Sequence, residues 1–138
     1  EDCSPHQVVN GYGRPLDETR YAWVSDPAQS LPQTLDIRWD TRLTLRSVAV
    51  TFDTDLINPA YSYLRLPVVT RTVKDYQLIY YGEQGATVLA DVKDNSLRYR
   101  RHVFEPIRTD HIQIKVTATH GDPSARIFEV RAYEERIL

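Results

Sequence analysis

The 138-residue sequence has a single cysteine, Cys3, which excludes an internal disulfide and a cysteine-rich metal site. No apolar run approaches the roughly 20 residues that a membrane-spanning helix needs. An excess of one charge is also missing, because 17 Lys and Arg residues oppose 19 Asp and Glu residues, for a formal net charge of -2. Such a chain has no general attraction to nucleic acid or to an anionic membrane, and neither is an expected partner.

Catalytic and metal-binding motifs are equally scarce. The sequence has no Gly-x-Ser-x-Gly, P-loop or Gly-x-Gly-x-x-Gly motif, and its four histidines lack zinc-type spacing. Asp53 and Asp55 would point to the same side of one strand, where such a pair more often faces solvent or binds a cation than acts as acid and base. We therefore expect the chain not to be an enzyme by itself.

Methionine is absent, and no secretory signal peptide is recognisable, so we expect a mature or excised part of a larger protein. The length suits one domain, 1–138, because no repeat, low-complexity tract or linker divides the sequence.

What the sequence does contain is apolar and polar residues in alternation, which predicts strands with one buried face. Leu35, Ile37 and Trp39 alternate with polar residues, and Val48, Val50 and Phe52 do so again. The predicted strands cover 34–39, 47–52, 76–80, 86–92, 99–104, 112–117 and 127–133. Seven short strands joined by Gly- and Pro-containing connections indicate an all-β, antiparallel β-sandwich.

Successive antiparallel strands alternate in direction, so every second connection lies at the same end of a sandwich. The long connections near 11–33, 54–74, 93–98 and 119–125 then share one end, and the short ones near 40–44, 82–85 and 105–109 share the other. Because long ordered loops often form binding surfaces, we predict the ligand site at the long-loop end.

Aromatic and planar hydrogen-bonding side chains are frequent in the long connections. Such residues can stack on the C–H face of a sugar and bind its hydroxyls, although Tyr and Arg also cover core edges in many proteins. Trp23 and Trp39 are predicted to belong to the core instead. The candidate carbohydrate contacts are Tyr61 and Tyr63 by stacking, and Arg65, Arg98 and His120 by hydrogen bonding.

The order of several segments resembles a known family. Asn10-Gly11, Trp23-Val24-Ser25-Asp26, the stretch 104–114 beginning Phe104-Glu105-Pro106-Ile107, and Ala125-Arg126-Ile127-Phe128-Glu129-Val130 follow one another as in coagulation factor 5/8 type C domains. This discoidin-like family has a galactose-binding-like jelly roll and includes the family 32 carbohydrate-binding modules. The sequence around Arg14-Pro15 and over 122–129 also resembles discoidin-like regions at the C-terminal end of some bacterial FAD-dependent oxidoreductases.

The resemblance implies a structural calcium ion near the opening loop, because the family commonly holds one with loop carbonyls, an Asp and a Glu of the last strand. Here Asn10 stands in place of the Asp, Asp17 can supply an oxygen, and Glu129 matches the Glu. The alternative is a metal-free site in which the Arg14 guanidinium pairs with Glu129.

The resemblance further implies a noncatalytic, lectin-like accessory module of a larger bacterial enzyme, extracellular or periplasmic, that binds a glycan or polysaccharide. The alternative is a structural or docking domain of a larger enzyme, such as an FAD-dependent oxidoreductase, with no free ligand. Membrane binding through Leu56, Ile57 and Leu64 ranks last because of the negative net charge.

Overall fold

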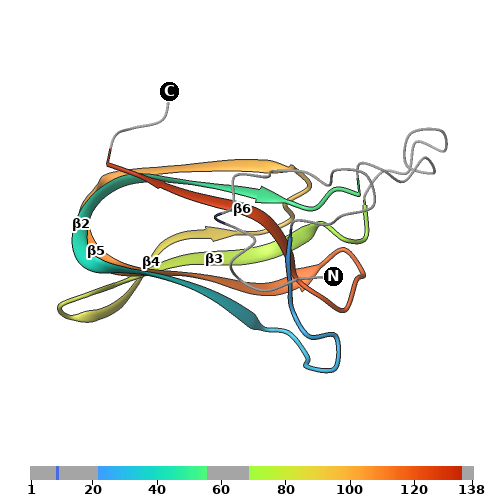
Figure 1. Ribbon diagram of the computed structural model, residues 1–138. Coiled ribbons are helices and arrows are strands. Elements are labelled where there is room, and N and C mark those ends of the chain that lie inside the picture. The colour runs from blue at the N-terminus through green and yellow to red at the C-terminus, as the bar shows by residue number, and fades with distance from the viewer. Residues whose placement is uncertain (1–8, 10–21, 56–68, 135–138) are drawn as a thin grey trace.

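The computed structural model describes residue 9, residues 22–55 and residues 69–134 (Figure 1). The regular structure in residues 22–55 and 69–134 is β-strand, joined by turns and loops. The strands are β1 (Trp23–Val24), β2 (Gln33–Phe52), β3 (Val73–Gly82), β4 (Gly85–Val92), β5 (Tyr99–Thr119) and β6 (Arg126–Tyr133). They pair in the order β1-β6-β2-β5-β3-β4, and every pair is antiparallel.

The sheet becomes a two-layered sandwich because β2 and β5 bend back together midway along their length (Figure 1). The first half of β2 pairs with the second half of β5, through Leu35 and Ile114 among others. The second half of β2 pairs with the first half of β5, as at Val50 and Arg100. β6 and β1 extend one layer, and β3 and β4 extend the other. The predicted jelly-roll β-sandwich is therefore confirmed.

Two of the predicted connections are wrong. The segments 40–44 and 105–109 are not turns between strands, because they lie inside β2 and β5 where these strands bend. The pairing shifts register between Arg38 and Leu43 and again between Leu45 and Ser47, as happens where bulges bend a strand. Pro106 falls in one of these gaps, so its missing amide proton costs no ladder hydrogen bond.

The core lies between the two layers and uses the inward residues of every strand. Leu35, Val50, Phe52, Leu78 and Ile114 are almost completely buried, and each such burial contributes about 1.5–3 kcal/mol. The prediction for Trp23 is confirmed, because it is 6% exposed within the core. Trp39 is only partly buried and packs at the core's edge.

One polar contact crosses the core. The Tyr76 hydroxyl donates to Nε2 of His102 over 2.7 Å, and the two rings meet edge to face. Burial raises the pKa of Tyr76 and lowers that of His102, and the neighbouring charge of Arg100 lowers both. A protonated phenol therefore donates to a neutral imidazole.

In the ranges that the structure covers, no helix has the length and apolar character needed to cross a bilayer.

Candidate functional site

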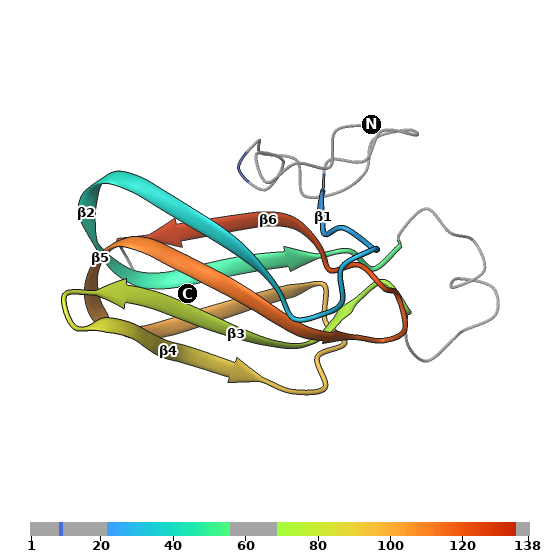
Figure 2. The same ribbon diagram turned by 90° about the horizontal axis from the view of Figure 1, so that it is seen from below.

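The described parts of the long connections, 25–32, 53–55, 69–72, 93–98 and 120–125, lie at one end of the sandwich, as the strand directions predict. β2 begins and ends at this end, β4 leads to it, β5 starts and ends there, and β6 departs from it (Figure 2). Backbone hydrogen bonds join the loops to one another: the His120 amide donates to the Thr72 carbonyl over 3.2 Å, and Asp122 donates to Thr70 over 3.2 Å. These loops form a connected surface, which we call the long-loop end.

Asn95 holds the loop 93–98 in place and is completely buried. Its amide nitrogen donates to the carbonyls of Val73 (2.8 Å) and Leu97 (3.1 Å). Its side-chain oxygen accepts from the Leu97 amide (3.2 Å) and from Nε of Arg100 (2.8 Å). All the hydrogen-bonding positions of this amide are used internally, so Asn95 is a structural residue of the site.

His120 lies beside this loop and is half-buried. Its Nε2 is 2.5 Å from the Asn95 carbonyl oxygen, which can only accept, so Nε2 carries the proton. In the neutral ring Nδ1 is then an acceptor, suited to a donor such as a sugar hydroxyl.

Arg98 comes from the same loop and is partly held by protein groups. Its Nη1 donates to the Phe52 carbonyl over 3.2 Å and to Thr54 Oγ1 over 3.5 Å. Its guanidinium carbon lies 5.2 Å from the centre of the Phe128 ring, within the range of a cation–π contact. The structure thus brings Arg98 and His120 to the long-loop end, and both are oriented by the loops that carry them.

The acidic pair of the sequence has a different environment from the one expected. Asp53 and Asp55 are 5% and 8% exposed rather than facing solvent. Asp53 accepts from the Asp55 amide (2.7 Å), and Asp55 pairs with Nη1 of Arg71 (3.2 Å). The pair caps the end of β2 and stabilises the start of the next loop, because Asp accepts readily from an amide two residues on.

Arg126 and Asp122 form a further partly buried ion pair. Arg126 Nη2 is 3.5 Å from an Asp122 carboxylate oxygen, and the other oxygen accepts from the Ser124 amide (2.9 Å). Nε of Arg126 is buried without a hydrogen-bond partner among the residues the structure describes.

The other predicted site residues lie outside the described residues. Tyr61, Tyr63 and Arg65 are in this group, as are the proposed calcium residues Asn10 and Asp17 and the alternative Arg14. Leu56, Ile57 and Leu64 are also outside. For these residues the sequence predictions stand as predictions.

Glu129 is the member of the predicted calcium set that the structure does describe. Its carboxylate forms an ion pair with Arg131, two residues along β6. A hydrogen bond to Tyr133 and the charge of Glu129 raise the pKa of Arg131. Over residues 22–55 and 69–134, no three His, Cys, Asp or Glu side chains gather as a metal site would require. The calcium site of Asn10, Asp17 and Glu129 stays a prediction, because Asn10 and Asp17 lie outside the described residues.

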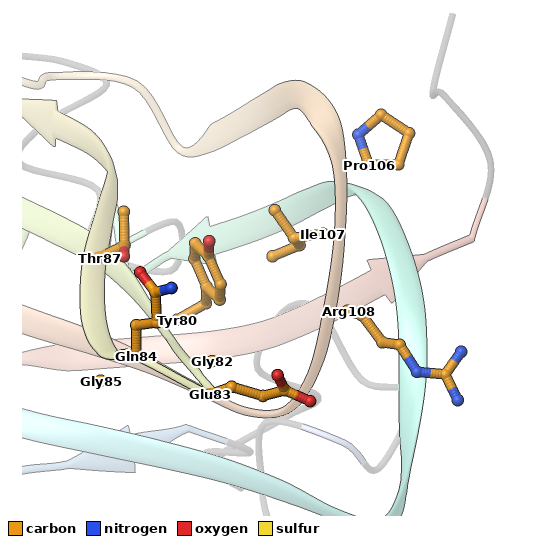
Figure 3. A pocket seen from close by; sticks show the side chains of 9 residues that line it. All are labelled: Tyr80, Gly82, Glu83, Gln84, Gly85, Thr87, Pro106, Ile107 and Arg108. Atoms are coloured by element: carbon orange, nitrogen blue, oxygen red, sulfur yellow. The ribbon is translucent and has the colours of Figure 1, made fainter.

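A pocket of about 360 Å³ lies at the opposite end, where the β3–β4 turn faces the bend of β5 (Figure 3). The pocket could not be predicted from the sequence, because its walls come from two separate segments of the chain, 80–87 and 106–108. The two glycines of this turn, Gly82 and Gly85, are the feature of the sequence that could have pointed to open space here.

Comparison with solved structures identifies the fold. Scans against family models and curated proteins found no match. The family 32 carbohydrate-binding module of Streptococcus pneumoniae EndoD superposes with a TM-score of 0.72, at 21% identity, over 96% of this chain and 86% of that one. The chain has the fold of a family 32 carbohydrate-binding module.

Two further structures share this discoidin-like fold. The family 32 module of C. perfringens NanJ, solved in complex with galactose, gives a TM-score of 0.70 at 19% identity, over 94% of this chain and 84% of that one. A Streptococcus pneumoniae fucose binding module gives 0.69 at 15% identity, over 97% and 84%. The predicted resemblance is thus confirmed at the level of the fold.

Proposed function

We propose that the chain is a noncatalytic carbohydrate-binding module that holds a glycan at the long-loop end. The observation that carries the proposal is the meeting of the described loop segments at one end, with Arg98 and His120 oriented there by Phe52, Thr54 and Asn95. Preorganised side chains lose little entropy on binding, which suits a shallow site for a sugar. Solved modules of the same fold include one in complex with galactose.

In this proposal Tyr61 and Tyr63 stack on the sugar ring, while Arg65, Arg98 and His120 bind its hydroxyls. His120 contributes Nδ1 as an acceptor, because its Nε2 is engaged by Asn95. Arg98 contributes its guanidinium, which Phe52 and Thr54 orient. The parent would be a larger bacterial enzyme outside the cytoplasm, where polysaccharides are encountered.

The test is a glycan-array screen of the 138-residue chain, with each hit confirmed by calorimetry. We expect reproducible binding to one class of sugar, weakened by Arg98→Ala and His120→Ala. The matched controls are Arg46→Ala and His111→Ala, since Arg46 is exposed in the bend of β2 and His111 stacks on Tyr81 in the outer face. A blank array, or binding that Arg98→Ala and His120→Ala leave intact, would contradict the proposal.

A docking domain of a larger enzyme is the second candidate, favoured by apolar side chains along two strands. Val88 in β4 and Tyr99 and Val103 in β5 are 50%, 48% and 49% exposed. β4 is the outer strand of one layer, and the first half of β5 is the outer strand of the other. If the array is blank, binding of the chain to its parent enzyme in trans, reduced by Val88→Asp and Val103→Asp, would support this alternative.

A further inference from the structure

The pocket at the end opposite the long-loop end is bordered by two glycines of the β3–β4 turn, Gly82 and Gly85. Tyr76, Leu78, Tyr80 and Gly82 lie on the same face of β3, and the Tyr80 ring comes within 3.2 Å of the place that a Cβ of Gly82 would take. The register partner of Gly82 is Gly85, where a Cβ would have no atom within 4 Å, so space is open on the β4 side of the turn. The sandwich is therefore open between its layers at this end.

The walls of the pocket combine apolar surfaces with uncharged polar groups. Tyr80 and Ile107 are partly buried and pack against the core, so their positions are fixed by the fold. Thr87 is the cross-strand partner of Tyr80 and lies on the same face of the hairpin. Gln84 extends from the turn, and Figure 3 shows its amide beside the Tyr80 ring, on the side toward Thr87.

The charged groups at the pocket do not require a charged ligand. Glu83 pairs with Nη1 of Arg42 over 2.8 Å, so its carboxylate is already matched by a cation. The side chain of Arg108 extends away from Tyr80, Gln84 and Thr87 (Figure 3). What remains near the Tyr80 ring is one amide, two hydroxyls and apolar carbon.

A rigid aromatic face beside a few hydroxyl and amide groups is the chemistry that binds an uncharged sugar residue. The volume of about 360 Å³ lies at the lower end of the range of about 300–1,000 Å³ for small-molecule sites. We infer that the pocket formed by Tyr80, Gln84, Thr87 and Ile107 is a second saccharide site for one uncharged, terminal sugar residue. This goes beyond the proposed function, which places its glycan at the opposite end of the sandwich.

The inference is tested by titrating the ¹⁵N-labelled chain with galactose, N-acetylgalactosamine and chitotriose while amide chemical shifts are recorded. For at least one sugar we expect saturable shifts in 80–88 and 107–109. Thr87→Val keeps the shape and β-branching but removes the hydroxyl, and we expect it to raise the Kd read from these amides about fivefold. Thr34→Val is the matched control, because Thr34 is an exposed threonine on β2, away from the pocket.

The same spectra separate this inference from the proposed function. Amides of 93–98 and 120–125 report on the long-loop end, and their shifts with Arg98→Ala test that site alone. No saturable shift in 80–88 and 107–109 with any of the three sugars would overturn the pocket inference whatever the loops do. Shifts there that Thr87→Val leaves unchanged would overturn it as well.

Discussion

Asn95 shows at the scale of one residue how the long-loop end keeps its shape. Asn95→Ala leaves the Val73 carbonyl, the Leu97 amide and Arg100 Nε without this partner, and these groups are buried or partly buried. We expect the free energy of unfolding to fall by about 3 kcal/mol, as for a lost buried hydrogen-bond network. Urea unfolding followed by fluorescence measures it.

The control is Ser96→Ala, an exposed substitution in the same loop that should change stability by less than about 0.5 kcal/mol. If Asn95→Ala were as stable as Ser96→Ala, the amide would not be the anchor of the loop, and the orientation of His120 would need another explanation.

The Tyr76–His102 pair predicts a pH dependence of stability. Burial, and secondarily Arg100, lower the pKa of His102 below its usual value of 6.5. The unfolded chain therefore binds a proton more readily than the folded one, and stability present above about pH 6.5 falls as the pH drops toward the folded pKa. Protonation would also turn Nε2 into a donor, so the Tyr76 hydroxyl could no longer donate to it.

We expect His102→Gln to lose less stability than the wild type between pH 7.5 and pH 5, in urea unfolding at each pH. His111→Gln is the matched control, because His111 contacts Asp36 on the outer face and not a buried phenol. Equal pH profiles for the wild type and His102→Gln would contradict this assignment.

The Glu129–Arg131 pair bears on the choice between calcium and a metal-free site. Because a guanidinium already neutralises Glu129, we expect the same Tm in 5 mM calcium and in chelator. A rise in Tm with calcium that Glu129→Gln abolishes would instead establish the ion.

Residue types at the site could be predicted from the sequence, but their partners could not. Counting strands predicted that Arg98 and His120 lie at the same end of the sandwich, and the structure has them there. That Asp53 and Asp55 would be buried was not predictable, because Arg71, which pairs with Asp55, belongs to another part of the chain. Alternation reports which side a residue faces and not which group it meets there.

At the scale of elements, the sequence predicted strand segments correctly and their ends less well. The segments 34–39 and 47–52 are halves of β2, and 99–104 and 112–117 are halves of β5. Alternation stops at a bend as it does at a turn, because a bulge shifts the side-chain phase. Only the pairing with a second, equally bent strand distinguishes the two cases, and that pairing is long-range.

Thr109 fixes the bend of β5 and gives a prediction for this element. It is 1% exposed, its hydroxyl oxygen lies 2.8 Å from the Tyr81 carbonyl oxygen, and it accepts from the His111 amide over 3.0 Å. Thr109→Val keeps the shape but leaves both backbone groups without this partner, so we expect a loss of about 2 kcal/mol in unfolding free energy. Thr109→Ser keeps the hydroxyl and should lose clearly less. Equal losses would attribute the effect to packing.

At the scale of the whole molecule, stability and binding are placed in different regions. The core lies between the layers, and the loops meet beyond the strand ends (Figure 2). That arrangement was predictable, because it follows from strand direction alone. The pocket at the other end was not, because it depends on how the β3–β4 turn faces the bend of β5.

This separation predicts that a loop substitution can remove binding without weakening the fold. We expect Tyr61→Ala combined with Tyr63→Ala to lower the affinity for the sugar found on the array about tenfold, since two stacking contacts are lost. The Tm should stay within about 2 °C of the wild type, because the buried residues of the core are untouched. Calorimetry and thermal unfolding measure the two effects. The control is Tyr99→Ala, which removes an exposed tyrosine of β5 and should change neither the affinity nor the Tm. Unchanged binding in the double variant would exclude both loop tyrosines from the site. A large drop in its Tm would assign them to the core.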